Sequence, residues 1–300
     1  DRMAREWPWT MTTLSTHDTK RSEDVRGRLS AMTEYPLEWE SLVTRLHSAT
    51  AHVRGPLVDP ETELLVWQIL AGTWRAPGLR ADALSGARLQ SYVEKAVREA
   101  KLHTAWVDGD PAYEEQVVMF AVAALESPDV DALFREWWEL TGAAQRAAVL
   151  GRKLVQLTMP GIPDVYQGNE AVDLSLVDPD NRRPVDHGEL LTRLTEVAST
   201  SGDSVGGNLP LGHEKLRLTR CALHVRRAYP GAFVAGHAGD GVYRPVHTGS
   251  PHAFAFARGE SDEGPARAVT VVTRLARSLT DQGGWRDSDV LVLDPGTVSY

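Results

Sequence analysis

A long helical stretch lies between two short strand-like segments in this chain, and few folds accommodate that order. Residues 36–150 carry helix signals throughout, with no convincing strand. Residues 9–16, before this stretch, are β-branched and aromatic, and residues 162–166, after it, form a short apolar run. Both compositions are typical of strands. We therefore expect an α/β chain in which a helical module is inserted between two strands.

Several helix starts are marked by capping residues. Asp59-Pro60 and Asp110-Pro111 each place a capping carboxylate before a proline at the first helical position. Pro128 opens another helix, and residues 143–157 are predicted to form a separate one. In residues 88–101, apolar side chains recur at i, i+3, i+4 and i+7, which predicts one apolar face of an amphipathic helix.

The sequence changes character after Phe233. One more helix is predicted before that point, over residues 215–227. Beyond it, residues 252–256 and 268–275 alternate in hydropathy or run β-branched, with Gly, Ser and Asp turns between them. This pattern predicts an antiparallel β domain with a last strand over residues 290–293.

Composition narrows the possible partners and the compartment. The chain has 300 residues, of which 42% are apolar and 24% charged, as in ordinary globular proteins. Its net charge of −9 argues against nonspecific binding to nucleic acid or anionic lipid. No apolar run approaches the roughly 20 residues that span a bilayer, and the first residues do not resemble a signal peptide. We therefore expect no nucleic-acid or membrane partner and a cytoplasmic location, which the single cysteine, Cys221, also suits.

The sequence contains no motif for a metal or a nucleotide cofactor. One cysteine makes neither an internal disulfide nor a cysteine-based zinc site. The histidines lack the spacings of zinc enzymes, and no EF-hand loop is present. No glycine-rich phosphate loop and no Gly-x-Ser-x-Gly nucleophile motif occurs. We expect no metal and no cofactor.

Thr16-His17-Asp18, after the first strand-like segment, has two interpretations. An imidazole and a carboxylate at the C-terminal end of a strand occupy the place where α/β barrels form active sites. Alternatively, Asp18 caps a helix that starts near Thr19, and the charges that follow are solvated. From these residues alone, the capping interpretation is favoured.

Two segments, in their order along the chain, resemble the α-amylase superfamily. His17-Asp18 after a strand is similar to the His-Asp motif at the end of that superfamily's seventh barrel strand. Residues 161–170, Gly-Ile-Pro-Asp-Val-Tyr-Gln-Gly-Asn-Glu, resemble the pattern of its last barrel strand. The resemblance implies the C-terminal part of a (β/α)8 TIM barrel, with strands 7 and 8, a large α-helical insertion and a C-terminal antiparallel β domain. The implied divisions are 1–45 (strand 7 and the following loop and helix), 46–141 (helical insertion), 142–232 (helix 7, strand 8 and closing helices) and 233–300 (β domain).

Three longer motifs resemble one family of that superfamily, the maltooligosyltrehalose synthases. Residues 15–26, Ser-Thr-His-Asp-Thr-Lys-Arg-Ser-Glu-Asp-Val-Arg, look like its extended His-Asp motif. Residues 175–186, Ser-Leu-Val-Asp-Pro-Asp-Asn-Arg-Arg-Pro-Val-Asp, look like its signature loop after the last strand. Residues 95–106, Lys-Ala-Val-Arg-Glu-Ala-Lys-Leu-His-Thr-Ala-Trp, resemble a third motif in the insertion, with Ala105 where the family has serine. The resemblance covers about residues 7–230 and fades in the β tail.

The resemblance implies an isomerase. The family converts the reducing-end α-1,4 linkage of a maltooligosaccharide into an α,α-1,1 linkage, by a retaining mechanism with an aspartate nucleophile and a glutamic acid as acid/base. By motif order Asp18 is the third, assisting carboxylate. The other two belong after strands 4 and 5, before residue 1, so we expect a fragment that is inactive alone and whose partner is the missing N-terminal portion of the same enzyme. The alternatives are a glucan hydrolase or a maltose–trehalose mutase of the same superfamily, or a non-catalytic glucan-binding module.

The motifs nominate side chains that would contact the maltooligosaccharide substrate, by donating to its hydroxyls, by stacking on a sugar ring (Tyr166) or by forming a lid or the +1 subsite (Asp180, Asn181 and Arg182). They are His17, Lys20, Arg21, Lys101, His103, Tyr166, Asp180, Asn181 and Arg182. Structural roles compete with these assignments. Arg182 or Arg183 can instead form an ion pair with Asp178 or Asp186. Glu23 and Asp24 can be first-turn acids that complement a helix dipole. Trp106 is a candidate sugar platform. Other tryptophans are expected in the core: Trp67, Trp74, Trp137 and Trp138.

Overall fold

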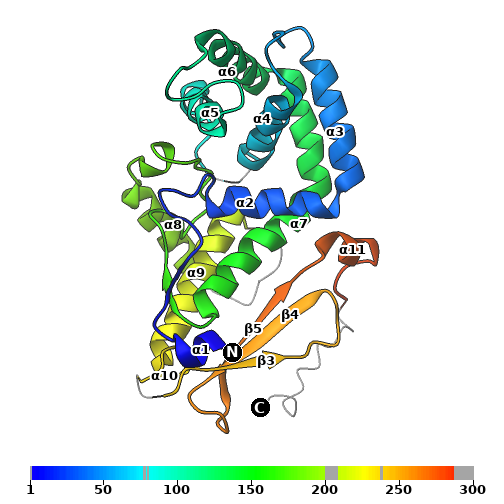
Figure 1. Cartoon of the computed structure of the whole chain (residues 1–300). Helices are drawn as coiled ribbons and strands as arrows, with labels where there is room; N and C mark the ends of the chain where they lie inside the picture. Colours follow the sequence, from blue (N-terminus) through cyan, green and yellow to red (C-terminus); the bar gives the residue numbers. More distant parts are fainter. Residues whose placement is uncertain (1, 77–78, 80, 200–208, 237–238, 287–300) are drawn as a thin grey trace. The chain divides into compact units, whose positions relative to one another are not determined.

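The structure is a computed structural model that mixes helices with β-sheet (Figure 1). It describes residues 2–76, 79, 81–199, 209–236 and 239–286.

Contacts divide the chain into two compact units. We call residues 17–142 and 173–183 the helical unit, and residues 1–16, 143–172 and 184–300 the sheet unit.

The helical unit confirms the helix starts that the sequence predicts. Its elements are α2 (Glu23–Ser30), η1 (Ala31–Glu34), α3 (Pro36–Ala49), α4 (Pro60–Thr73), α5 (Gly86–Ala100), α6 (Pro111–Glu126), η2 (Asp180–Arg182) and the first part of α7 (Pro128–Thr158). The Asp59 carboxylate accepts the Thr62 N–H (2.9 Å), and the Asp110 carboxylate caps α6 in the same way. Each aspartate therefore satisfies backbone donors that a helix start leaves open.

The core of the helical unit is aromatic and aliphatic. Trp67 on α4 and Phe120 on α6 are fully buried, with ring centroids 5.4 Å apart in an edge-to-face arrangement. Trp137 is buried as expected, whereas Trp74 and Trp138 are half-buried. The apolar face of α5 packs on α6, as its periodicity indicates.

One helix prediction is wrong. Residues 128–158 form the single long helix α7, not a helix from Pro128 followed by a second one over 143–157. The residue at the expected junction, Gly142, keeps helical geometry. A glycine inside a helix lowers its propensity by only about 1 kcal/mol, and no proline or capping residue there enforces a break.

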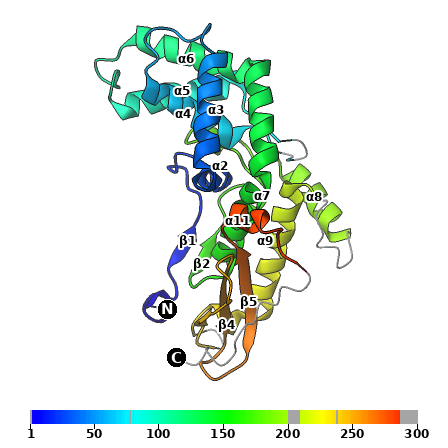
Figure 2. The same ribbon diagram turned by 90° about the vertical axis from the view of Figure 1, so that its right-hand side faces the viewer.

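The sheet unit contains a two-stranded parallel sheet (Figure 2). Strand β1 (Met11–Thr13) pairs with β2 (Ile162–Asp164) in register from Met11 opposite Ile162 to Thr13 opposite Asp164. Gln156 of α7 donates to the Asp164 carbonyl (2.8 Å) and lies within 3.5 Å of the Thr12 carbonyl. Both predicted strands are thus present and parallel, although each is shorter than its sequence pattern indicates.

The rest of the sheet unit is helical and antiparallel β. Its remaining elements are α1 (Arg2–Glu6), α8 (His187–Ser199), α9 (Leu211–Ala228), α10 (Pro230–Phe233), β3 (Val242–Val246), β4 (Ala253–Gly259), β5 (Ala266–Thr273) and α11 (Ala276–Asp281). Strands β3, β4 and β5 form an antiparallel sheet in that order, which confirms an antiparallel β region. The strand predicted over residues 290–293 lies outside the described residues. Sequence reasoning missed β3, which carries Pro245 and lies at an edge of the sheet, where a strand tolerates proline.

Candidate functional site

The three motifs meet in the helical unit. We call residues 17–22 the His-Asp segment and residues 173–183 the signature loop. The signature loop pairs with the His-Asp segment, and both contact helix α5, which carries the third motif.

Backbone hydrogen bonds join the signature loop to the His-Asp segment. The Ser22 N–H donates to the Ser175 carbonyl (2.9 Å), and the Asp178 N–H donates to the His17 carbonyl (3.3 Å). Arg21 forms an antiparallel bridge with Leu176. Segments more than 150 positions apart in the sequence therefore form one short ladder.

Helix α5 holds the signature loop through two cations. Arg88 donates to both carboxylate oxygens of Asp180, from Nε at 2.6 Å and from Nη2 at 2.9 Å. Lys95 Nζ donates to the Asp178 carbonyl (2.9 Å). Asp180 also accepts the Leu176 N–H (2.8 Å). The Asp180 carboxylate is thus buried and fully engaged with protein donors, which makes it a structural centre of the loop.

The charge state of Asp180 follows from these contacts. Burial alone raises the pKa of its carboxyl, because the charged form loses hydration. The hydrogen bonds from Arg88 and from the Leu176 N–H, with the nearby Arg183 guanidinium, outweigh burial and hold the pKa below its usual value. Asp180 is therefore ionised at neutral pH.

Asp18 differs from Asp180 in its exposure. Its side chain is 82% exposed, and one carboxylate oxygen lies 3.2 Å from His17 Nε2. The Asn181 side-chain amide donates to the His17 carbonyl (3.0 Å), which ties the His-Asp pair to the signature loop. The helix that follows begins at Glu23, with Ser22 as its N-cap, so the idea that Asp18 caps a helix near Thr19 is wrong.

Lys20 and Arg21 present cationic groups beside α5. Lys20 Nζ donates to Glu99 (2.8 Å), and this hydrogen bond raises the pKa of the lysine. Arg21 is half-buried, and its Nε and Nη2 atoms are buried with no hydrogen-bond acceptor among the described residues. Burial raises the pKa of the Tyr92 hydroxyl, and the nearby positive charges of Arg21 and Lys20 act in the opposite direction. Donors of this kind are suited to hydroxyl and other oxygen ligands.

The signature-loop arginines form ion pairs. Arg182 Nε lies 2.8 Å from the Asp178 carboxylate, which is one of the ion pairs that the sequence left open. Arg183 bridges the buried Asp180 (3.1 Å) and the exposed Asp82 (2.8 Å). These pairs stiffen the loop and leave Arg182 more than half exposed.

Three other nominated residues have different surroundings. Lys101 ends α5 in a left-handed conformation (φ 57°) and is exposed. His103 lies 3.4 Å from the Asp59 carboxylate and packs on the Tyr113 ring, with centroids 4.9 Å apart. Tyr166 belongs to the sheet unit, follows β2 and is half-buried.

Sequence reasoning missed how the site is supported, because it gave Ser22 and Asp24 no such role and did not name Arg88. Asp24 on α2 is buried, and its carboxylate accepts the Asp173 N–H (2.8 Å). The Ser22 hydroxyl donates to the Asp173 carbonyl (2.6 Å). Arg88 lies outside the quoted motifs altogether. Only its position on the α5 helix, two turns before Lys95, was available as a signal.

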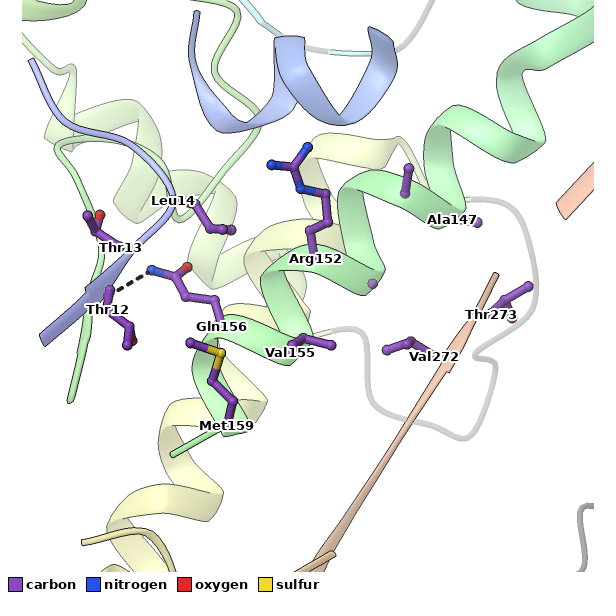
Figure 3. A pocket seen from close by; sticks show the side chains of 12 residues that line it. Thr12, Thr13, Leu14, Ala147, Arg152, Val155, Gln156, Met159, Val272 and Thr273 are labelled. Atoms are coloured by element: carbon purple, nitrogen blue, oxygen red, sulfur yellow. Dashed lines mark hydrogen bonds between the residues drawn. The ribbon is translucent and has the colours of Figure 1, made fainter. Parts of the chain in front are cut away.

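The sheet unit has a pocket of its own, of about 290 Å³, between β1, α7 and β5 (Figure 3). It is lined mostly by apolar groups, among them Leu14, Val155, Met159 and Val272. Such a lining does not suit a polyhydroxylated ligand, so we place the candidate site in the helical unit. Within the described ranges, no cluster of three His, Cys, Asp or Glu side chains could hold a metal ion. None of the helices in those ranges combines the length and apolar character needed to span a bilayer.

Comparisons with known proteins agree with the motifs. A Mycobacterium tuberculosis protein named as a maltooligosyl trehalose synthase is 39% identical over 297 residues, which is 98% of this chain and 34% of that protein. The maltooligosyltrehalose synthase structure from Arthrobacter ramosus matches 96% of this chain and 34% of its own, at 38% identity with a TM-score of 0.77. A Sulfolobus tokodaii structure, described as a hypothetical maltooligosyl trehalose synthase, is 29% identical over 86% of this chain, with a TM-score of 0.69. No protein-family model matches.

The resemblance predicted from the three motifs is thus confirmed, and it extends over nearly the whole chain. The chain spans about a third of the length of the relatives it matches.

Proposed function

We propose that this chain is the C-terminal part of a maltooligosyltrehalose synthase, an intramolecular transglucosylase that forms the α,α-1,1 linkage at the reducing end of a maltooligosaccharide. The observation that supports this most is the meeting of the His-Asp segment, the signature loop and α5 in one compact unit. The three segments come from distant parts of the sequence, and their contacts bring residues of all three motifs together beside Asp18 in the chain.

The finer fold is part of the proposal. We assign β1 and β2 as strands 7 and 8 of a (β/α)8 barrel, because their parallel pairing is the geometry that such strands require. Residues 46–141 are then an insertion between them, and residues 233–300 a β domain that follows the barrel. Residues 1–45 and 142–232 supply the barrel strands and their helices.

In the proposed chemistry, Asp18 is the assisting carboxylate of a retaining mechanism. It accepts hydrogen bonds from sugar hydroxyls that strengthen as positive charge develops on the ring. We assign neither the nucleophile nor the acid/base to any residue of this chain. Both would come from the remaining two thirds of the enzyme, which is the partner we propose.

The nominated side chains take different roles in this scheme. His17, Lys20 and Arg21 donate to hydroxyls, since they flank Asp18 in the sequence. His17 and Lys20 are at least half exposed, and Arg21 Nε and Nη2 have no acceptor among the described residues. Asn181 fixes the His17 backbone. Asp180 and Arg182 act by shaping the signature loop, whose closure would exclude water from a freed glucose. Lys101 and His103 are proposed as outer contacts of the glucan in the helical unit. Tyr166, in the sheet unit, is proposed separately as a residue that stacks on a sugar ring.

A chimaera tests the proposal. This chain would replace the matching third of the Arthrobacter ramosus enzyme, and the hybrid would be incubated with maltopentaose. Loss of reducing ends without release of glucose is the expected result. Asp18→Asn should lower kcat by about 100- to 1,000-fold, because a group that stabilises charge in the transition state is lost. Asp262→Asn, at an exposed turn of the sheet unit, is the matched control and should retain activity.

Other products would decide against the mutase. Release of glucose and shorter maltooligosaccharides would identify a glucan hydrolase. Conversion of maltose to trehalose would identify a maltose–trehalose mutase. A hybrid that folds and binds glucan but rearranges nothing would leave the chain as a glucan-binding module. Asp18→Asn activity equal to that of the control would remove Asp18 from the mechanism.

A further inference from the structure

The loop between α5 and α6, residues 101–109, exposes three large apolar side chains. Leu102 is 68% exposed, Trp106 60% and Val107 76%. Single exposed apolar residues are common on protein surfaces, but here three lie within six positions of one loop. Tryptophan is enriched where a side chain contacts a partner, because its ring is apolar and its N–H can still reach water.

This loop is rigidly built beneath its exposed side chains. The Thr104 hydroxyl is buried and donates to Glu114 (2.6 Å), and the Asp110 N–H donates to the same hydroxyl (2.9 Å). Glu114 also accepts two hydrogen bonds from Arg98, at 3.0 and 2.6 Å. These bonds from Arg98 lower the pKa of Glu114, so the pair is charged at neutral pH. The loop is thus fixed at its base by a charge-assisted network.

The same network holds the ring of Trp106. The Arg98 guanidinium lies 5.2 Å from the Trp106 ring centroid, a cation–π contact. Because Arg98 is itself held by Glu114, the indole is supported from one side while most of it stays open to solvent. A ring fixed before the ligand arrives loses little entropy on binding.

The surroundings of the ring suit a sugar. One face of a glucose ring presents C–H groups, which pack on an aromatic surface, and its hydroxyls point outward to polar neighbours. Lys101 and His103 belong to the same loop and are exposed enough to donate to such hydroxyls. A planar aromatic surface edged by a few polar groups is the usual composition of a small-molecule contact.

The ring also lies close along the chain to the candidate site. Arg98 is adjacent on α5 to Glu99, which pairs with Lys20 of the His-Asp segment. One turn before Arg98, Lys95 donates to the signature loop. The last turns of α5 therefore carry both the supports of the site and the support of Trp106.

We propose that Trp106, backed by Arg98, is a stacking platform for a glucose unit of the maltooligosaccharide, away from the rearranged linkage. The idea rests on the proposed function for its ligand, an α-1,4-glucan, but its test does not depend on catalysis.

Fluorine NMR on the 300-residue chain labelled with 5-fluorotryptophan tests the platform. Trp106→Phe and Trp9→Phe assign the two signals, and Trp9 is a matched control because it is 59% exposed in the sheet unit. Maltoheptaose should shift the Trp106 signal saturably and leave the Trp9 signal in place. A Trp106 signal that does not move, or that moves no more than the Trp9 signal, would overturn the proposal.

Kinetics of the chimaera then separate this inference from the proposed function. Trp106→Ala should raise KM by about three- to tenfold with kcat unchanged, the signature of lost uniform binding. An active hybrid whose KM is unchanged by Trp106→Ala would refute Trp106 as a stacking platform and leave the proposed mutase activity standing. An inactive hybrid whose Trp106 signal still shifts with maltoheptaose would refute the proposed mutase activity and leave the stacking platform standing.

Discussion

Replacing Asp180 with asparagine should loosen the signature loop by an amount that its contacts allow us to work out. Asp180→Asn removes the charge that faces Arg88, whose side chain is only 14% exposed. Breaking a buried ion pair costs about 3–5 kcal/mol when the remaining charge has no other partner. Here Arg88 keeps a bond to the Ala83 carbonyl (2.8 Å), so we expect about 2–3 kcal/mol. At 1.4 kcal/mol per tenfold, that corresponds to amide exchange about 30- to 150-fold faster in the loop.

Asp82→Asn is the matched control, because Asp82 pairs with Arg183 of the same loop but is 76% exposed. An exposed pair contributes about 0.5 kcal/mol, so exchange should accelerate only about twofold. Hydrogen exchange followed by mass spectrometry on peptides covering residues 173–183 measures both variants. Equal acceleration by the two substitutions would refute the assignment of Asp180 as the structural centre of the loop.

The pH dependence gives this prediction a second check. The folded-state pKa of Asp180 is depressed, so its stabilising effect is fully present above the unfolded pKa of about 3.9 and is lost as the pH falls through the folded value. The difference between the wild-type chain and Asp180→Asn should therefore be constant from pH 7 to pH 5 and shrink below about pH 4. A difference that persists unchanged at pH 3 would mean that the carboxylate charge is not the cause.

Three further substitutions separate the effect of packing on stability from that of surface charge. Gly72→Ala should lower the free energy of unfolding by about 1–3 kcal/mol, because the added Cβ lies 2.7 Å from Val25 Cγ1. Gly151→Ala in α7 should be neutral or stabilising, because the nearest atom to its added Cβ is 3.5 Å away. Equal thermal midpoints for the two variants would contradict this. Lys20→Met should change stability by less than about 0.5 kcal/mol, since Lys20 is 60% exposed, yet raise the KM of the chimaera. The hydrogen bond to Glu99 raises the pKa of Lys20, so the stability that the pair contributes is present below the unfolded-state pKa of about 10.4 and is lost as the pH rises through the folded-state pKa. The difference in thermal midpoint between the wild-type chain and Lys20→Met should therefore stay constant from pH 5 to pH 9.

Local signals in the sequence were sufficient to predict where a helix begins when a single capping residue determines that start. Asp59 and Asp110, each before a proline, fix where α4 and α6 begin, because capping acts within one helical turn. The break expected near Gly142 was wrong, since continuity of α7 depends on packing along its length and not on that residue alone. Strand β3 was missed for a similar reason. Residues 242–246 form a strand because they pair with the neighbouring strand β4, and a local sequence pattern does not reveal such pairing.

The site divides in the same way. The motifs located Asp18, Lys20 and the signature loop, because their residue types recur in a recognisable order. They did not reveal Arg88, which meets Asp180 across 92 positions of sequence. No periodicity or spacing encodes a contact of that separation, since it is set by how α5 packs in the helical unit.

Burial distinguishes two acids of the extended His-Asp motif, Asp18 and Asp24, and it limits what each can contact. Asp24 was expected as a first-turn acid that complements a helix dipole, and it does lie in the first turn of α2. Its carboxylate, however, is 1% exposed and holds the Asp173 N–H, so a dipole effect at the surface does not account for it. Asp18, in the same motif, keeps 82% of its side chain in solvent. A buried carboxylate whose oxygens already accept protein donors cannot also serve a substrate, because each new ligand would displace a bond that the fold needs. Of these two acids, only Asp18 can contact a sugar without breaking the hydrogen bond by which Asp24 holds the signature loop.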